Sequence, residues 1–89
     1  MAYHPKNIHE RILHRLKIAQ GHLTKVLNMT EDKQYCIDIL HQSNAVQRAL
    51  KEADNLIMEN HLNTCASDAI KKGQKTKAIK EVMSVFEKI

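Results

Sequence analysis

The sequence predicts an all-α fold built from long helices, and three observations lead to that prediction. The chain has 89 residues but only two glycines and one proline, so it lacks the frequent turn residues of a β-sandwich or barrel. Apolar residues recur at spacings of three and four, which is the period of an amphipathic helix. Few aromatic residues are available for the core, and a short helical chain of this kind usually completes its core by oligomerising.

The first helix is expected to follow a short polar arm, residues 1–6. Asn7 and Glu10 have the spacing of a capping box, in which an N-cap acceptor is answered by an acid three residues later. The helix should continue to about Met29, because an apolar seam runs through Ile8, Ile12, Leu16, Ala19, Leu23 and Val26. Gly21 lies inside this helix at a cost of roughly 1 kcal/mol relative to alanine. The glycine either allows a neighbouring helix or DNA backbone to approach closely, or it is simply tolerated by the helix at this cost.

The second helix is predicted to be the longest, from about Glu31 to Asn63. The segment Thr30-Glu31-Asp32 supplies a capping residue and acidic side chains for its N-terminus. Its seam consists of Ile39, Ser43, Val46, Leu50, Ala53 and Ile57. A helix of this length extends about 45 Å, which is more than a small monomer needs. We therefore expect it to form the spine of an antiparallel dimeric bundle.

Two further helices complete the single domain that we predict for residues 1–89. A short third helix starts near Ser67-Asp68 and ends at Lys71-Lys72-Gly73, with cations in its last turn and a glycine after it. The final helix runs from about Lys75 to Lys88, and its apolar face contains Ile79, Val82, Phe86 and Ile89.

The net charge of +4 is unevenly distributed along the chain. Residues 1–28 contain five Lys/Arg and one acid, whereas residues 29–62 contain three Lys/Arg and six acids. A basic first helix suits an anionic partner such as DNA, although charge alone is equally consistent with a solvated helix face. No apolar run is long enough to span a membrane, and there is no signal-peptide pattern at the N-terminus. We therefore expect a cytoplasmic protein, in which cysteines remain reduced thiols.

The candidate functional residues are Cys36 and the segment His61-Leu-Asn-Thr-Cys65. His61 and Cys65 are four residues apart, so they share one face of a helix. Cys36 lies 25 residues before His61 with no glycine or proline between them, which separates the two residues by about 37 Å if the interval is one helix. One copy cannot bring all three side chains to one metal. Two antiparallel copies can, because each Cys36 then lies beside the His61 and Cys65 of the other copy.

Two thiolates and one imidazole are soft donors that favour trigonal Cu(I), whereas Zn(II) normally requires a fourth ligand. Spacing alone also fits another interpretation, since a cysteine in an apolar helix is often a small buried hydrophobic residue. Tyr35 and Glu81 are candidate hydrogen-bond partners that would orient His61. No phosphate-binding loop or nucleophile motif is present, so we do not expect an enzyme.

The chain resembles the CsoR family of copper-sensing operon repressors. The resemblance rests on Arg15-Leu16-Lys17, Gly21-His22-Leu23, Tyr35-Cys36-Ile37-Asp38, Ala45-Val46-Gln47, Asn60-His61-Leu62-Asn63-Thr64-Cys65 and Ala78-Ile79-Lys80-Glu81. It extends from about residue 11 to the C-terminus, and the Cys…His-x₃-Cys set is specific for the copper-sensing branch.

This resemblance implies a three-helix subunit, an antiparallel four-helix dimer and usually a homotetramer made of two dimers. It also implies that the apoprotein binds operator DNA and that Cu(I) releases it. Cys36 of one subunit would bind Cu(I) together with His61 and Cys65 of the other, with Tyr35 and Glu81 as the surrounding partners. The positions that match DNA-contact positions of the family lie on the basic surface of the first helix around Arg15 and at Arg48 on the second helix. The candidate DNA-contact residues are Arg11, Arg15, Lys17 and Arg48.

Three features depart from the family pattern. Ile18 and Gln20 stand where the family is often more charged, and Ser43-Asn44 replaces a usual Ile-Ser pair. His4 stands 32 residues before Cys36, an offset that resembles a ligand of the nickel- and cobalt-sensing branch. That branch has a histidine at the position of Cys65, so Cys65 favours copper.

Three other functions remain open from the sequence. A repressor of the same fold could sense nickel or cobalt, or it could respond to thiol or persulfide chemistry through Cys36 and Cys65 without His61. A copper-buffering protein would bind Cu(I) without binding DNA.

Overall fold

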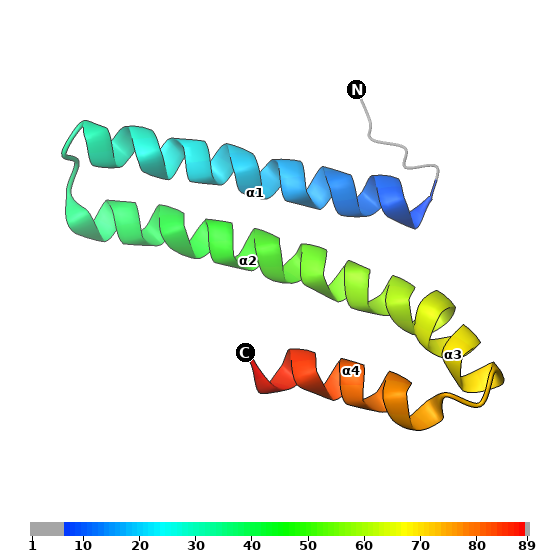
Figure 1. The fold of residues 1–89 in the computed structure, drawn as a ribbon. Helices are drawn as coiled ribbons and strands as arrows, with labels where there is room; N and C mark the ends of the chain where they lie inside the picture. The colour runs from blue at the N-terminus through cyan, green and yellow to red at the C-terminus, as the bar shows by residue number, and fades with distance from the viewer. Residues whose placement is uncertain (1–6, 89) are drawn as a thin grey trace. The chain divides into compact units, whose positions relative to one another are not determined.

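The computed structural model describes residues 7–88, and these residues are almost entirely helical (Figure 1). The elements in chain order are α1 (Ile8–Glu31), α2 (Cys36–His61), the π-helix η1 (Leu62–Ala66), α3 (Ser67–Lys71) and α4 (Lys75–Glu87). Residues 7–88 contain no strand, so the predicted all-α class is confirmed. His4, which the sequence offers as an additional ligand, lies outside the described residues.

The beginning of α1 agrees with the sequence prediction. Asn7 has an extended backbone conformation, and its side-chain oxygen accepts a hydrogen bond of 2.9 Å from the backbone N–H of Glu10. This bond satisfies one of the backbone donors that the first turn of a helix leaves without an intrahelical partner.

The predicted boundary between the first two helices is wrong. α1 continues to Glu31 and α2 begins only at Cys36. Thr30 does not cap α2, because its hydroxyl donates a 2.8 Å bond back to the carbonyl of Val26 within α1. The backbone then closes a Schellman turn in which the N–H of Gln34 donates to the carbonyl of Met29 at 3.0 Å.

Lys33 is the physical reason for this difference. It occupies the left-handed position of the turn, with φ of 54°, and its N–H donates to the carbonyl of Thr30 at 3.1 Å. Glycine normally marks this position in a sequence, so a lysine there gives no signal of a helix end.

From α2 onward the backbone remains helical to the end of α3. His61 and Ser67, which flank η1, both have right-handed helical dihedral angles. The predicted end of the second helix at Asn63 therefore falls inside a π-helical turn. A second Schellman turn follows α3, as predicted from Gly73, which has φ of 81°. In this turn Gly73 donates to Ile70 at 3.1 Å and Gln74 donates to Ala69 at 2.8 Å.

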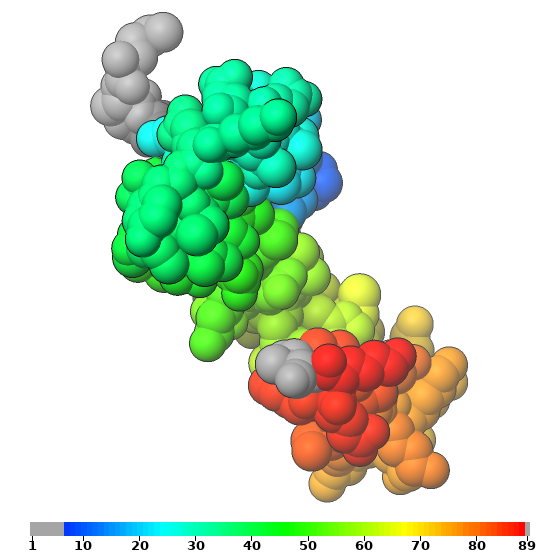
Figure 2. Space-filling model, turned by 90° about the vertical axis from the view of Figure 1, so that its left-hand side faces the viewer, coloured from blue at the N-terminus to red at the C-terminus, as the bar shows by residue number. Residues whose placement is uncertain are grey.

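The chain divides into two compact units, of which the first ends at Ile57 and the second begins at Met58. In the first unit, α1 and α2 up to Ile57 lie side by side and run antiparallel (Figure 1, Figure 2), and an ion pair between Arg15 of α1 and Glu52 of α2 joins them. The buried residues of this helix pair are mainly small ones; they are Ala19, Met29, Ala49 and Ala53. Small side chains allow two helices to approach closely along their contact line.

The second unit contains the end of α2, η1, α3 and α4. Helix α4 contacts both η1 and α3. Ala66 of η1 and Ala78 of α4 are buried, with 5% and 3% of their surfaces exposed, so alanine again lies where helical segments pack closely.

The predicted apolar seams are only partly buried in one copy of the chain. Ala19 and Ala53 are buried, whereas Leu16, Leu23 and Leu50 remain 38%, 48% and 43% exposed. No large side chain among residues 7–88 is fully buried, and fifteen large apolar or aromatic side chains in that range are exposed. Monomeric proteins rarely leave this much apolar surface in water, which favours association of several copies.

Gly21 offers a direct test of how closely another molecule approaches α1. A Cβ atom added at this position would meet nothing within 4 Å in the single chain. We therefore expect Gly21→Ala to raise the free energy of unfolding by roughly 1 kcal/mol, because alanine restricts the unfolded chain and favours the helix. Urea denaturation at fixed protein concentration measures this change.

Gly73→Ala is the matched control, because the left-handed backbone at Gly73 strains any residue with a Cβ atom. It should lower the free energy of unfolding by about 1 kcal/mol. A Gly21→Ala protein that is less stable than the parent would contradict the expectation and would indicate that another copy packs against Gly21.

Candidate functional site

Cys36 is the first residue of α2 and has a free, exposed thiol. Tyr35 precedes it, and the Tyr35 carbonyl accepts the N–H of Ile39 at 3.2 Å, which forms the first turn of the helix. The Tyr35 side chain is 67% exposed. The predicted thiol ligand therefore lies at the accessible start of a long helix.

His61 and Cys65 lie at the other end of that helix. His61 is the last residue of α2, and Cys65 lies in η1 with a free, exposed thiol. A π-turn has i→i+5 hydrogen bonds in place of i→i+4 bonds, so residues four apart still complete almost one turn. His61 and Cys65 therefore stand on roughly the same side of the helical segment.

The π-helical turn also gives Cys65 a polar neighbour. The hydroxyl of Thr64 donates to the carbonyl of Asn60 at 2.7 Å and lies 3.7 Å from Cys65 Sγ. Sequence reasoning did not identify η1 or the role of Thr64, because no simple residue pattern marks a π-turn. Such turns are frequent at functional sites.

One copy of the chain does not bring the three predicted ligands together. Cys36 and His61 are the first and last residues of the 26-residue helix α2. Among residues 7–88, no three His, Cys, Asp or Glu side chains form a group that could hold a metal ion. The donor set of two thiols and one imidazole suits Cu(I) chemically, but a single copy supplies only His61 and Cys65 at one place.

Glu81, the predicted hydrogen-bond partner of His61, is on α4 in the same unit as His61 and Cys65. Its side chain is exposed, and no hydrogen bond joins it to His61 within this unit. The Glu81 backbone carbonyl accepts the hydroxyl of Ser84 at 2.7 Å. Because α4 contacts η1, the helix that carries Glu81 lies next to the segment that carries Cys65.

The four candidate DNA-contact residues are all exposed; they are Arg11, Arg15, Lys17 and Arg48. Arg15 is not free in the structure, because its Nη1 atom lies 2.9 Å from Oε2 of Glu52 on α2. Both side chains are about half exposed, 46% and 58%. Sequence reasoning missed Glu52, since the pairing depends on how α1 and α2 are aligned in space.

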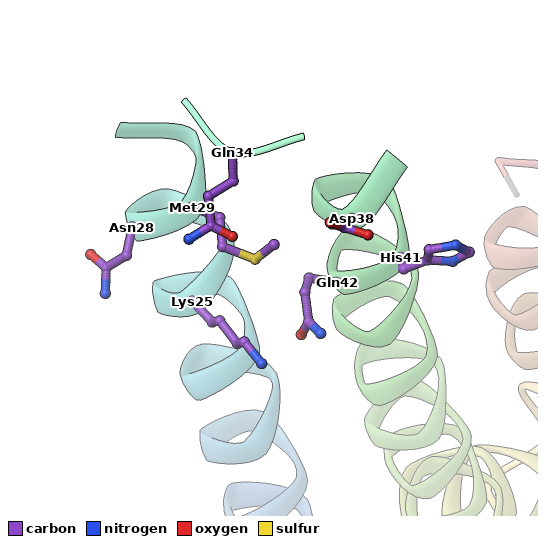
Figure 3. A pocket seen from close by; sticks show the side chains of 7 residues that line it. All are labelled: Lys25, Asn28, Met29, Gln34, Asp38, His41 and Gln42. Carbon is purple, nitrogen blue, oxygen red and sulfur yellow. The ribbon is translucent and has the colours of Figure 1, made fainter. Parts of the chain in front are cut away.

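The first unit contains a polar cavity of about 440 Å³ between the end of α1 and the start of α2 (Figure 3). Lys25, Met29 and Gln42 extend toward the space between the two helices, whereas Asn28 and His41 point away from it (Figure 3). The polar groups of this cavity therefore do not converge on one point, as they would in a specific small-molecule site.

A second hollow of about 360 Å³ in this unit is apolar. It lies between α1 and α2 and is lined by Leu13, Leu16, Lys17, Ala19, Gln20, Leu23, Val46 and Leu50. It contains several of the exposed leucines of the predicted seams, and these side chains are suited to packing against another apolar helix face.

None of the described helices combines the length and hydropathy that crossing a bilayer requires.

Comparisons with known proteins agree with this architecture. Residues 8–88 match the family model described as metal-sensitive transcriptional repressor. The chain is 42% identical over 79 residues to the copper-sensing transcriptional repressor CsoR of Bacillus subtilis (strain 168), a match that covers 89% of this chain and 78% of that protein. It is also 42% identical over 75 residues to the protein of the same name from Mycobacterium ulcerans (strain Agy99), covering 84% of this chain and 64% of the relative.

A solved structure is similar over almost the whole chain. It is the crystal structure of the copper-sensing repressor CsoR with Cu(I) from Geobacillus thermodenitrificans NG80-2. The TM-score is 0.83 at 38% sequence identity, and the alignment covers 99% of this chain and 92% of that chain.

Proposed function

Because the chain belongs to the family of metal-sensitive transcriptional repressors, we propose that it is a Cu(I)-responsive repressor. The apoprotein binds operator DNA in the cytoplasm, and Cu(I) binding releases the DNA. The relatives described above are named copper-sensing, and one of them was solved with Cu(I). The donor chemistry of Cys36, His61 and Cys65 supports the same metal in this chain.

The observation that carries this proposal is the division of the donors between the two ends of α2. His61 and Cys65 are one turn apart at one end, and Cys36 is at the other. In an antiparallel pair of copies, the start of each α2 lies beside the end of the other α2. Each pair therefore forms two equivalent sites, and each site takes Cys36 from one copy and His61 and Cys65 from the other.

Exposed apolar side chains supply the surface for this pairing. Leu13, Leu16, Leu23 and Leu50 are between 38% and 48% exposed in the single chain. Fully burying an exposed aliphatic side chain contributes about 1.5–3 kcal/mol. These leucines are already more than half buried, so covering the rest of each contributes roughly 1 kcal/mol, and several leucines per copy together favour association. We infer a homodimer built in this way and a homotetramer made of two dimers.

The Cu(I) site is linked to DNA binding through the assembly. Metal ligands from two copies fix the relative positions of those copies, which favours one arrangement of the dimer over others. If DNA prefers a different arrangement of the dimer, Cu(I) weakens the binding of DNA, and DNA weakens the binding of Cu(I) by the same factor. In this proposal one imidazole nitrogen of His61 binds Cu(I), and Tyr35 and Glu81 are the candidate acceptors of a hydrogen bond from the other nitrogen. Such a bond would orient the imidazole ring.

DNA binding is assigned to the exposed basic residues of α1 and α2; they are Arg11, Arg15, Lys17 and Arg48. Contacts from such residues to phosphates position a protein on DNA and make its affinity steeply dependent on salt.

A thiol-responsive repressor is the second candidate, because Cys36 and Cys65 are both free and exposed. In that function a persulfide oxidises Cys36 of one copy and Cys65 of the other to a disulfide, the persulfide is reduced to a thiol and hydrogen sulfide, and His61 is not required. Sensing of nickel or cobalt would require a further nitrogen donor, and copper buffering would require no DNA binding.

We expect Cu(I) to lower the affinity of the parent protein for duplex DNA from the region of its own gene by roughly 5- to 150-fold, which corresponds to a coupling of about 1–3 kcal/mol. His61→Ala should retain the DNA affinity of the apoprotein and lose most of the Cu(I) response, because one of three ligands is missing. Fluorescence anisotropy under anaerobic conditions measures both quantities.

His41→Ala is the matched control, because it removes an exposed histidine of α2 that is not a proposed ligand, and it should respond to Cu(I) as the parent does. Equal DNA affinity with and without Cu(I) in the parent protein would contradict the regulatory proposal. Two results together would support the thiol-responsive function. The DNA affinity of the parent protein would not change with Cu(I), and His61→Ala would release DNA with a persulfide donor as fully as the parent does.

Glu52→Gln should increase the affinity of the apoprotein for operator DNA. Arg15 must leave Glu52 or share its guanidinium before it can contact a phosphate, and an exposed ion pair of this kind contributes up to about 1 kcal/mol. Its removal therefore raises affinity by up to roughly fivefold for each Arg15 that contacts DNA.

The control for this experiment is Glu31→Gln, which also removes one negative charge, here from the end of α1, and leaves the contact between Arg15 and Glu52 intact. Binding titrations at several salt concentrations compare the two variants. Equal increases in affinity in both would attribute the effect to net charge alone and would exclude a specific role for Glu52.

A further inference from the structure

Five lysines surround the turn between α3 and α4. Residues 71–80 contain Lys71, Lys72, Lys75, Lys77 and Lys80 and no acidic residue. We call these five residues the lysine cluster. All five side chains are exposed, and the cluster lies in the unit that also carries His61 and Cys65. It is distinct in sequence from the basic residues of α1 and α2 to which DNA binding is assigned above.

The backbone of the turn concentrates these charges. The Schellman turn at Gly73 joins the last residue of α3 to the first residue of α4 through only three residues. Lys71 and Lys72 at the end of α3 are therefore close to the first turn of α4, and α3 and α4 are in contact. Among residues 7–88, no carboxylate forms an ion pair with any of the five ammonium groups.

The local electrostatics of α4 are unfavourable without an anion. The N-terminus of a helix carries a partial positive charge, which favours acids in the first turn and disfavours lysines. The first turn of α4 contains Lys75 and Lys77 but no acid, and its N-cap residue Gln74 makes no side-chain capping hydrogen bond. Both the lysines and the backbone N–H groups of this turn are consequently suited to contact phosphate oxygens.

The composition of the segment indicates which kind of nucleic acid it fits. No aromatic residue lies between residues 66 and 85, so the segment cannot stack on the bases of a single strand. It contains no Arg or Asn and only one Gln, Gln74, so planar side chains that read base edges bidentately are almost absent. Lysine ammonium groups act as point charges toward phosphates.

We propose that the lysine cluster binds the phosphate backbone of duplex DNA and adds a second, sequence-independent contact to the one made by α1 and α2. This inference rests on the proposed function, since it assigns a further contact within the same DNA complex. Because Cys65 and Lys71 are six residues apart in one continuous helical stretch, the proposal places a DNA contact immediately after the metal-ligand segment.

The test compares Lys75→Gln/Lys77→Gln with a control pair, Lys33→Gln/Lys88→Gln, which removes the same charge outside the cluster. Each full-length apoprotein is titrated onto duplex DNA from the region of its own gene at several salt concentrations. The slope of log K against log salt should become shallower in the cluster variant by about 0.9 for every phosphate that it no longer neutralises. The control pair and a charge-conserving Lys75→Arg/Lys77→Arg variant should keep the slope of the parent.

Thermal unfolding shows whether the cluster variant folds, and we expect it to be at least as stable as the parent because two cations leave the N-terminus of α4. A parental slope in the cluster variant, or an equally shallow slope in the cluster and control pairs, would overturn the inference while leaving the proposed repressor function intact.

A parent protein that binds no duplex DNA would overturn both the inference and the proposed function. Vesicles of phosphatidylcholine and phosphatidylserine provide the remaining comparison. If the lysine substitutions abolish vesicle binding and leave the DNA slope unchanged, the cluster is a membrane-surface contact and the inference is wrong.

Discussion

The length of α2 is the constraint on which the proposed function depends. The helix starts at Cys36 and ends at His61, and a helix of this length separates its first and last residues by about 37 Å. The chemistry that Cys36, His61 and Cys65 can perform as a set therefore requires a second copy. The exposed leucines of α1 and α2 point to the same requirement, because one copy buries mainly alanines among its residues 7–88. Metal binding and assembly are consequently two aspects of one proposal.

Much of this architecture could be predicted from local sequence signals. The Asn7 cap at the start of α1, the Gly73 turn and the extent of α4 all follow from residue types whose conformational preferences are strong. The prediction that Cys36 and His61 belong to one long helix is confirmed, and it followed from the absence of glycine and proline between them. The fold class followed from the scarcity of glycine and proline together with the helical spacing of apolar residues.

The features that could not be predicted depend on unusual conformations or on tertiary contacts. Lys33 adopts the left-handed conformation that glycine usually provides, so the start of α2 was placed five residues too early. The π-turn of η1 has no sequence marker. The contact of Arg15 with Glu52 depends on the alignment of two helices in space. Each of these features lies beside a candidate functional residue, where local preference is most often overridden.

The intersubunit origin of the metal site can be tested most directly by mixing two inactive variants. Cys36→Ala retains His61 and Cys65, whereas His61→Ala/Cys65→Ala retains only Cys36, so neither homodimer has a complete site. Dimers formed by refolding the two variants together have one complete site. We expect tight Cu(I) binding, measured by anaerobic competition with a chelator, to reappear in the mixture and to be absent from each variant alone. A mixture that binds no more Cu(I) than the two separate variants would contradict a site shared between copies.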